Sequence, residues 1–479
     1  MTRRETLKKI TIATVALGAS GCMAEQSAQA TLAINTKDAN AEATPLTIPP
    51  LAKYTLKDGK KVFDLTAQKG KKTFRDNPSD TYGINGDYLG PTIQVEKGDQ
   101  ITLNVTNSLS ENFTLHWHGL HVEGQNDGGP HSIIKEGDTW SPSFEVLNQA
   151  GSYFYHPHTH KKTAYQTYMG AAGMFLIEDK TSQNLGLPNT YGEDDIPLVL
   201  QDKYLNKDGE MEYSTGMRVT MHGMPVNTYL TNGDINPTLE AKKTLLRLRI
   251  LNNSNANPWV IAFSDQREFH QIATDAGLLE KPYRTNGLFL APAERIEIIV
   301  DLSDKPSTLS LTIYNGQTII PALTIDATNA EKSTLTVPSK LAQIDWIDEK
   351  QSTQTRNFKL TMGMGRVAIN GKQMNMQVID EAVKLGATEI WTVTNNSMMN
   401  MGHPFHIHGT SFQILDRNGK KPIESERGWK DVVFVESGET VRIIATFNYQ
   451  ADKNTPYMYH CHILEHEDAG MMGQFTVSL

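Results

Sequence analysis

INGDYLGPTIQV at residues 84–95, followed by ITLNVTNS at 101–108, is a turn and a strand that the chain uses three times. The same pair returns as LTNGDINPTLEA with LRLRILNNS at 230–254, and as AINGKQMNMQVI with EIWTVTNNS at 368–397. The Asn-Ser ends begin at Asn107, Asn253 and Asn396, so the unit recurs after 146 and then 143 residues. A period of this length is the size of a domain rather than of a solenoid repeat.

Each unit has the pattern of short antiparallel strands. Apolar side chains alternate with polar ones, as at Ile101, Leu103 and Val105, and Gly, Asn, Asp or Pro separate the runs. Helical periodicity is scarce. The sequence therefore predicts an all-β protein built from three consecutive Greek-key β-sandwich domains. The predicted domain bounds are 45–182, 190–335 and 345–479.

Residues 1–30 have the layout of a secretory signal. A basic stretch precedes a short apolar segment, and small residues follow it. Arg3 and Arg4 resemble the twin-arginine pattern, which is recognised by a pathway that exports folded proteins. We therefore expect a periplasmic protein.

Two cleavage points compete in this segment. Cleavage after Ala30 leaves a flexible segment, 31–44, ahead of the first domain, and we favour it. Cleavage before Cys22 would instead allow lipid attachment at that cysteine, because Ala19 to Cys22 weakly resembles a lipoprotein box.

Composition limits the partners. The chain of 479 residues has a formal charge of −9, and residues 1–30 carry four basic and two acidic residues, so the remainder carries −11. Such a surface makes nucleic acid a poor partner. No run approaches the ~20 apolar residues that span a bilayer, so we expect no transmembrane segment.

The histidines sort by domain. Ten of the fifteen are assigned to four motifs, HWHG, HPHTH, HPFHIHG and HCHILEH, which begin at residues 116, 156, 403 and 460. The first two motifs lie in the first repeat and the last two in the third. The remaining five are interpreted as ordinary surface or core residues: His121, His131, His156, His222 and His270.

A His-x-His pair on a strand directs both side chains to one face, where they can bind one metal ion or two adjacent ions. Four such pairs, split between the end domains, predict a polynuclear metal centre at the interface, and imidazole ligands suit copper or zinc. The pairs are His116 with His118, His158 with His160, His406 with His408, and His460 with His462. In HPHTH the spacing also allows His156 with His158.

Cys461 lies between two of these histidines, and its only possible disulfide partner, Cys22, lies in the expected signal. On a strand its side chain must face away from both neighbours, so it belongs to a different metal. His403 and His466 offer two nitrogens, and Met471 offers a soft thioether. Two histidines, one cysteine and a weak methionine form the ligand set of a blue-copper electron-transfer site.

These motifs, together with TNGDINP, LRLRILN and GWKD, resemble those of the multicopper oxidases, and they are most similar to the bacterial cuprous oxidases of copper efflux. The resemblance covers nearly the whole chain after the signal. It implies cupredoxin-like domains, four copper ions, and transfer of electrons from a type 1 copper to a trinuclear cluster that reduces O2 to water.

The resemblance also implies a role for each ligand. The type 1 copper takes His403, Cys461, His466 and Met471. The type 2 copper takes His116 and His406. The type 3 pair takes His118, His158 and His462 on one ion and His160, His408 and His460 on the other, which leaves His156 outside.

Oxygen reduction consumes protons, and two carboxylates match the family's pattern for donors. They are Asp127, nine residues after His118, and Glu467, directly after His466. The GWKD segment resembles the family as well, but the sequence suggests no physical role for it.

Methionines raise the question of substrate. Met398, Met399 and Met401 directly precede His403, and thioether sulfur binds Cu(I) but also fills cores. The methionine-rich insertion of the cuprous oxidases is missing between the second and third repeats. We therefore expect an open type 1 site that accepts Cu(I), phenols and aromatic amines.

Two other functions are compatible with the fold. One is a non-enzymatic septal-ring protein that keeps the fold but has lost ligands, and the complete ligand set argues against it. The other is a periplasmic protein that sequesters copper without turnover. We expect an oxidase that acts as a monomer in copper tolerance.

Overall fold

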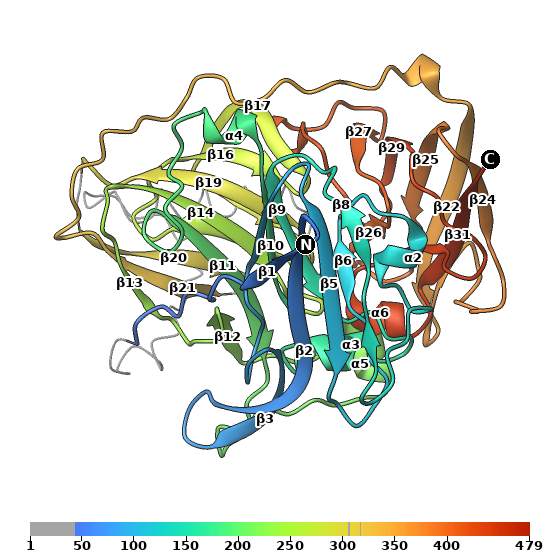
Figure 1. Cartoon of the computed structure of the whole chain (residues 1–479), viewed down its shortest axis with the longest axis horizontal. Helices are drawn as coiled ribbons and strands as arrows, with labels where there is room; N and C mark the ends of the chain where they lie inside the picture. The colour runs from blue at the N-terminus through green and yellow to red at the C-terminus, as the bar shows by residue number, and fades with distance from the viewer. Residues whose placement is uncertain (1–43, 305–306, 317) are drawn as a thin grey trace, which may run out of the picture.

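The computed structural model describes residues 44–304, 307–316 and 318–479. The predicted signal, Cys22 and the segment up to residue 43 lie outside the described residues. Within these described residues, six β-sheets stack in three pairs along the chain, coloured blue to cyan, green to yellow and orange to red in Figure 1. The predicted all-β class with three consecutive β-sandwiches is confirmed.

The first sandwich holds the strands up to residue 178. Its larger sheet contains β1 (Tyr54–Lys57), β2 (Lys60–Thr73), β3 (Pro78–Ile84), β5 (Gln100–Asn107), β7 (Thr139–Trp140) and β8 (Ser143–Glu145). Its smaller sheet has the order β4 (Ile93–Glu96), β10 (Gly173–Glu178), β9 (Gly151–His156) and β6 (His116–His118). The HWH motif therefore forms the edge strand of the smaller sheet.

The second sandwich follows the same plan. One sheet has the order β12 (Thr228–Thr231), β11 (Asp195–Lys203), β14 (Leu245–Asn252), β19 (Arg295–Asp301), β16 (Phe269–Thr274) and β17 (Gly277–Thr285). The other has the order β13 (Thr238–Glu240), β21 (Ile319–Asp326), β20 (Thr308–Tyr314), β15 (Trp259–Phe263) and β18 (Leu288–Leu290).

The third sandwich contains the remaining histidine motifs. One sheet has the order β23 (Arg366–Ile369), β22 (Gln354–Gly363), β25 (Thr388–Asn395), β29 (Thr440–Thr446) and β27 (Phe412–Arg417). The other has the order β24 (Glu381–Lys384), β31 (Met472–Ser478), β30 (Tyr457–Cys461), β26 (His403–Ile407) and β28 (Val432–Val435).

Short helices connect the strands. They are α2 (Gly124–Asp127), α3 (Thr163–Tyr168), α4 (Lys180–Gln183), α5 (Met217–His222) and α6 (Leu464–Asp468), with 3-10 turns η2 (Glu349–Gln351) and η3 (Glu424–Glu426). Figure 1 shows α3, α5 and α6 together, one from each sandwich. The carboxylate of Asp468 in α6 accepts hydrogen bonds from the backbone N–H groups of Thr163 and Ala164, both at 3.0 Å. These bonds hold α6 against the first sandwich.

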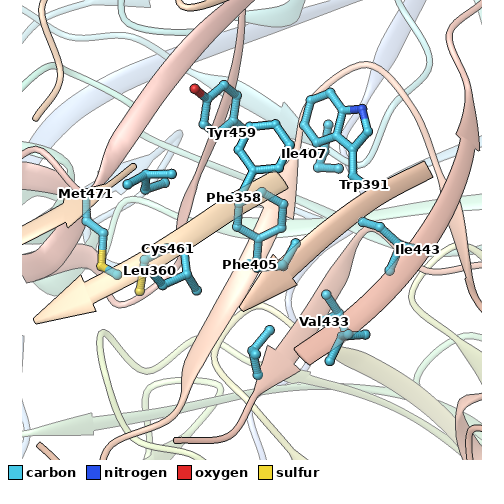
Figure 2. Close-up of a cluster of buried hydrophobic side chains, with 14 of the residues drawn as sticks. Phe358, Leu360, Trp391, Phe405, Ile407, Val433, Ile443, Tyr459, Cys461 and Met471 are labelled. Carbon is cyan, nitrogen blue, oxygen red and sulfur yellow. The ribbon is translucent and has the colours of Figure 1, made fainter. Parts of the chain in front are cut away.

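Alternating burial explains the sandwiches. In β5 the apolar residues are buried and the polar residues between them are partly exposed, so one face packs on the core. The core of the third sandwich is aromatic, and Figure 2 shows Phe358, Trp391 and Tyr459 grouped in it. The ring centroid of Phe358 lies 4.5 Å from that of Trp391 and 4.8 Å from that of Tyr459. Removal of such a ring costs about 3–5 kcal/mol, so this core holds β30 in place.

Candidate metal centre

Neighbouring strands in the first and third sandwiches bring the histidine motifs together. In the first sandwich β6 pairs with β9, so that His116 lies opposite His156. In the third, β26 pairs with β30, so that His406 lies opposite His460. Residues opposite each other in antiparallel strands point to the same face. Figure 1 shows β6 beside β26, where the two sandwiches meet.

The histidines form one buried cluster across this boundary. The rings of His116 and His408 stack at 3.9 Å between centroids, and those of His118 and His406 stack at 3.8 Å. All four rings are buried. Each stacked pair takes one residue from each sandwich, so the cluster exists only where both are folded and docked.

Three rings point their Nε2 atoms at one another. His460 Nε2 lies 3.3 Å from the Nε2 atoms of both His158 and His408. Burial lowers the pKa of His158 to about 4 and that of His408 well below its ordinary value, so these rings are neutral. Converging neutral imidazole nitrogens are the arrangement that a metal ion requires.

The ring nitrogens on the outer side are held by oxygen atoms. His116 Nδ1 donates to the backbone carbonyl of Asp127 at 2.8 Å, and His406 Nδ1 donates to that of Asp431 at 2.7 Å. His408 Nδ1 donates to Asp127 Oδ2 at 2.7 Å. Because the proton is held on the outer nitrogen, the inner nitrogen is left as a free lone pair. The Nε2 atoms of His116 and His406 are buried without a partner.

Both predicted carboxylates lie beside the cluster, fully buried. Asp127 ends α2, and the next residue, Gly128, has φ 78° and no room for a Cβ beside the Leu115 carbonyl, so the turn that places Asp127 requires glycine. Glu467 lies 3.4 Å from His158 Nδ1 and 3.2 Å from His460 Nδ1. Burial alone would raise the pKa of Glu467, but these imidazoles lower it below its ordinary value.

The HPHTH motif has a different register from the one assigned by resemblance. His156 is buried among the cluster rings, 5.2 Å from His462 and 5.6 Å from His118 between centroids. His160 is half-buried in the turn before α3 and belongs to none of the convergent groups found among the described residues. Strand β9 ends at His156. Beyond it, His158 still reaches the cluster, with its Nε2 3.3 Å from that of His460, whereas His160 lies in the following turn. The structure thus brings His156 and His158 into the cluster, the alternative pair that the spacing of HPHTH allows, rather than His158 and His160.

Asp431, the last residue of GWKD, is a site residue that the sequence did not explain. Its backbone carbonyl accepts from His406, and its carboxylate oxygen Oδ1 lies 3.2 Å from His118 Nε2. In the sequence, the only sign of its role is an acidic residue directly before the apolar run of β28. Without the fold, nothing in the sequence placed it beside two histidines.

The cysteine site lies on the other side of β30. Cys461 Sγ is 3.4 Å from His403 Nδ1 and 3.6 Å from His466 Nδ1. Met471 is buried in the same core, and its backbone carbonyl accepts a hydrogen bond from the Cys461 N–H at 3.0 Å. Figure 2 shows the Met471 side chain near Cys461. Ser397 Oγ contacts the outer nitrogen of His403 at 2.8 Å.

Both groups fit metal ions. The buried, partnerless imidazole nitrogens of the cluster would otherwise go unsatisfied. Burial raises the pKa of the Cys461 thiol well above its usual range, so a thiolate there requires a bound cation. Imidazole with one thiolate and a thioether matches the preferences of copper.

The methionines gather at a different point than the sequence suggested. Met398 is 76% exposed, whereas Met399 and Met401 pack against the core of the third sandwich. The turn between β22 and β23 carries Met364, 95% exposed, and Met217 of α5 is 70% exposed. A Cβ placed on Gly363 would lie 2.8 Å from Met398 Sδ, and one on Gly365 would lie 3.3 Å from Met217 Sδ. Three exposed thioethers therefore surround one turn.

Known proteins share this architecture. Two multicopper oxidase family models match residues 66–182 and 338–479. A multicopper oxidase of Staphylococcus aureus is 40% identical over 428 residues, 88% of this chain and 89% of that protein. The cell division protein FtsP of Xenorhabdus nematophila is 34% identical over 452 residues, 91% of this chain and 93% of that protein.

Among solved structures, the laccase-like multicopper oxidase CueO from Ochrobactrum sp. superposes with a TM-score of 0.85 at 37% identity, covering 90% of this chain and all of that one. None of the described helices has the length and apolar character of a membrane span. The predicted family is confirmed: the chain belongs to the multicopper oxidases.

Proposed function

We propose that the protein oxidises a one-electron donor at the Cys461 site and passes the electrons to the histidine cluster, where O2 is reduced to water. The donors are Cu(I) and phenols or aromatic amines, and the physiological setting is copper tolerance in the periplasm. The relatives support an oxidase of this family, and the donor is the part that rests on this chain's own residues.

One observation carries the proposal. His460, Cys461 and His462 are consecutive, yet the sulfur faces His403 and His466 while the flanking rings face the cluster. Strand alternation produces this division. The backbone of Cys461 thus links its sulfur covalently to both neighbouring histidines, and this short path joins the two sites.

We assign four copper ions to these residues. When bound, copper supplies one-electron transfer at the cysteine site and oxygen chemistry at the cluster. His403, Cys461, His466 and Met471 hold the type 1 ion, and His116 with His406 hold the type 2 ion. The type 3 pair is held by His118, His156 and His462, and by His158, His408 and His460.

Glu467 and Asp127 move protons in this proposal. Each carboxylate contacts the outer nitrogen of a cluster histidine, so neither side chain is needed as a ligand. A buried carboxylate within reach of the cluster can pass protons to reduced oxygen. The same contacts orient His460 and His408.

The exposed methionines suit Cu(I) as a donor. Met217, Met364 and Met398 present soft sulfur at the surface, in two sandwiches, around the β22–β23 turn. Ser397, which precedes Met398, is half-exposed and contacts buried His403. This contact provides a short route from the surface to the type 1 ligand. The turn is tight and carries no insertion, which leaves room for organic donors.

Steady-state O2 consumption with Cu(I) and with a bulky phenol, on one copper-loaded sample, tests the proposal. Replacing Met217, Met364 and Met398 by leucine should lower Cu(I) turnover and leave phenol turnover largely unchanged. The matched control replaces Met399 and Met401, which pack on the core, and should affect neither donor selectively. Equal loss of both activities in the triple variant would show that the thioethers do not bind donor.

A non-enzymatic role remains the second candidate, because the FtsP proteins named for cell division are nearly as similar along the chain. A copper-sequestering protein belongs to the same class. Both candidates predict a copper-loaded protein that consumes no O2 when either donor is added. Any sustained uptake of O2 under those conditions excludes them.

A further inference from the structure

The middle sandwich provides none of the proposed ligands, yet one of its side chains reaches the edge of the cluster. Arg295 begins β19 and is fully buried. Its Nε donates to the carbonyl oxygen of Ser152 in β9 at 2.9 Å, and its two terminal nitrogens donate to Asp431 directly before β28. The guanidinium therefore lies where all three sandwiches meet.

Every N–H of this guanidinium has an acceptor. Nη1 donates to Asp431 Oδ1 at 2.7 Å and to the Ala293 carbonyl at 2.9 Å. Nη2 donates to Asp431 Oδ2 at 2.6 Å and to the Asp275 carbonyl at 2.8 Å. Arginine has five such donors in one rigid plane, and here all are used. The orientation of the Asp431 carboxylate is therefore fixed by a two-pronged contact.

Asp431 in turn holds two histidines of the cluster. Its backbone carbonyl accepts from His406 Nδ1, and Oδ1 accepts from His118 Nε2 at 3.2 Å. With its proton on Nε2, His118 has a free lone pair on Nδ1, and Nδ1 is the nitrogen that is buried without a partner. Arg295 engages both oxygens of the same carboxylate, so the side chain of Asp431 is held in one orientation against His118.

His118 is thus inverted relative to its neighbours. His116, His406 and His408 hold a proton on Nδ1 and direct Nε2 inward. In a neutral imidazole the hydrogen bond made by the outer nitrogen sets which nitrogen carries the proton. For His118 that bond is the one to Asp431.

We infer that Arg295 is a positioning residue for the histidine cluster: it aligns Asp431 so that His118 presents Nδ1 rather than Nε2 to the metal. The inference rests on the proposed function in so far as it takes the metal to be copper. The middle sandwich thereby contributes to a centre to which it supplies no ligand.

The test compares two buried arginines of one sheet. Arg295→Lys keeps the positive charge but removes the paired hydrogen bonds from Nη1 and Nη2 to the two oxygens of Asp431. Arg247→Lys is the control, because Nε and Nη2 of Arg247 both donate to Oε2 of Glu297 in the same sheet, and these hydrogen bonds reach no cluster residue. Both variants are made in the Cys461→Ser background, which removes the absorption of the cysteine site.

Two readouts are recorded for each variant. In the metal-free protein, ring ¹⁵N shifts of His118 should report the Nε2–H tautomer in the parent and in Arg247→Lys, and its loss in Arg295→Lys. In the copper-loaded protein, resistance of the cluster copper to a chelator should fall about ten- to a hundredfold in Arg295→Lys only, with a changed EPR spectrum. Asp431→Asn should follow Arg295→Lys.

Identical tautomer, copper retention and spectrum in the two lysine variants would overturn the inference. If the single variants do not fold, Arg295→Met combined with Asp431→Leu removes both charges together, and an unchanged His118 tautomer there overturns it equally. A parent that shows the tautomer but binds no copper at the cluster would contradict the proposed function and leave the positioning role supported.

Discussion

The histidine cluster and the cysteine site are neighbours with opposite surroundings. The cluster lies between two sandwiches, and its outer ring nitrogens contact oxygen atoms of Asp127, Asp431 and Glu467. The cysteine site lies within one sandwich, and Figure 2 shows Cys461 beside Leu360 and Met471 in the apolar core. The polar groups within hydrogen-bond distance of Cys461 Sγ are two imidazole nitrogens and the N–H of Ile463.

The difference matches two kinds of chemistry. Electron transfer needs little more than a low-dielectric site whose geometry changes little, and an apolar core provides it. Oxygen reduction also needs protons, and the carboxylates at the cluster can hold and deliver them. Substitutions at the two sites should therefore have separable effects on electron entry and on oxygen reduction.

Cys461→Ser should abolish the blue colour and the oxidation of both donors, because the thiolate is the source of the absorption and the electron path. The cluster should keep its copper, since its own ligands are untouched. Visible spectra and copper content per chain check both statements. A fully loaded variant that stays blue would show that the sulfur is not a ligand.

His156→Ala and His160→Ala should differ sharply. His156 lies inside the cluster, so its loss removes a proposed ligand and should lower turnover by more than the about hundredfold that loss of an outer partner costs. His160 lies outside, so its loss should change turnover by less than about twofold, as surface substitutions usually do. Copper content and O2 uptake are measured for both variants. A larger loss in His160→Ala than in His156→Ala would support the pair implied by the resemblance, His158 with His160.

Glu467→Gln should retain the blue colour and slow oxygen reduction by about a hundredfold or more, the range for loss of a positioned proton donor. The cysteine site should be reduced by donor at the unaltered rate, because Glu467 contacts cluster rings. Stopped-flow spectroscopy measures the two half-reactions separately. Loss of copper at unchanged folding would indicate a structural role instead.

Met471→Leu should have the smallest effect. Leucine preserves the apolar bulk, and the two histidines with Cys461 still define the site, so the colour should persist. The reduction potential should shift, because the weak axial ligand tunes it. Redox titration measures the shift, and bleaching of the protein would mean that the thioether is a primary ligand.

Sequence reasoning reached the fold and most of the cluster because both follow from periodicity. Alternation along strands placed His116 with His118 and separated Cys461 from its neighbours without any knowledge of the fold. It left HPHTH open, because the three histidines are equally spaced. The resemblance implied His158 with His160, whereas the structure places His156 and His158 among the cluster rings.

The contribution of the middle sandwich to the cluster could not be predicted from the sequence either. Arg295 follows Glu294 at the start of an apolar strand, and its partners, Ser152 and Asp431, lie 143 and 136 residues away. A buried arginine predicts that some carboxylate lies nearby, but not which one. The grouping of the exposed methionines could not be predicted either, because Met217, Met364 and Met398 come together only when two sandwiches dock.

The coupling of the two regions is the central claim, and the ratio of donor oxidised to O2 consumed tests it most directly. The copper-loaded protein should oxidise four molecules of a one-electron donor for each O2, with no hydrogen peroxide detected in the same cell. A ratio of two with peroxide released, or oxidation of donor without uptake of O2, would contradict it.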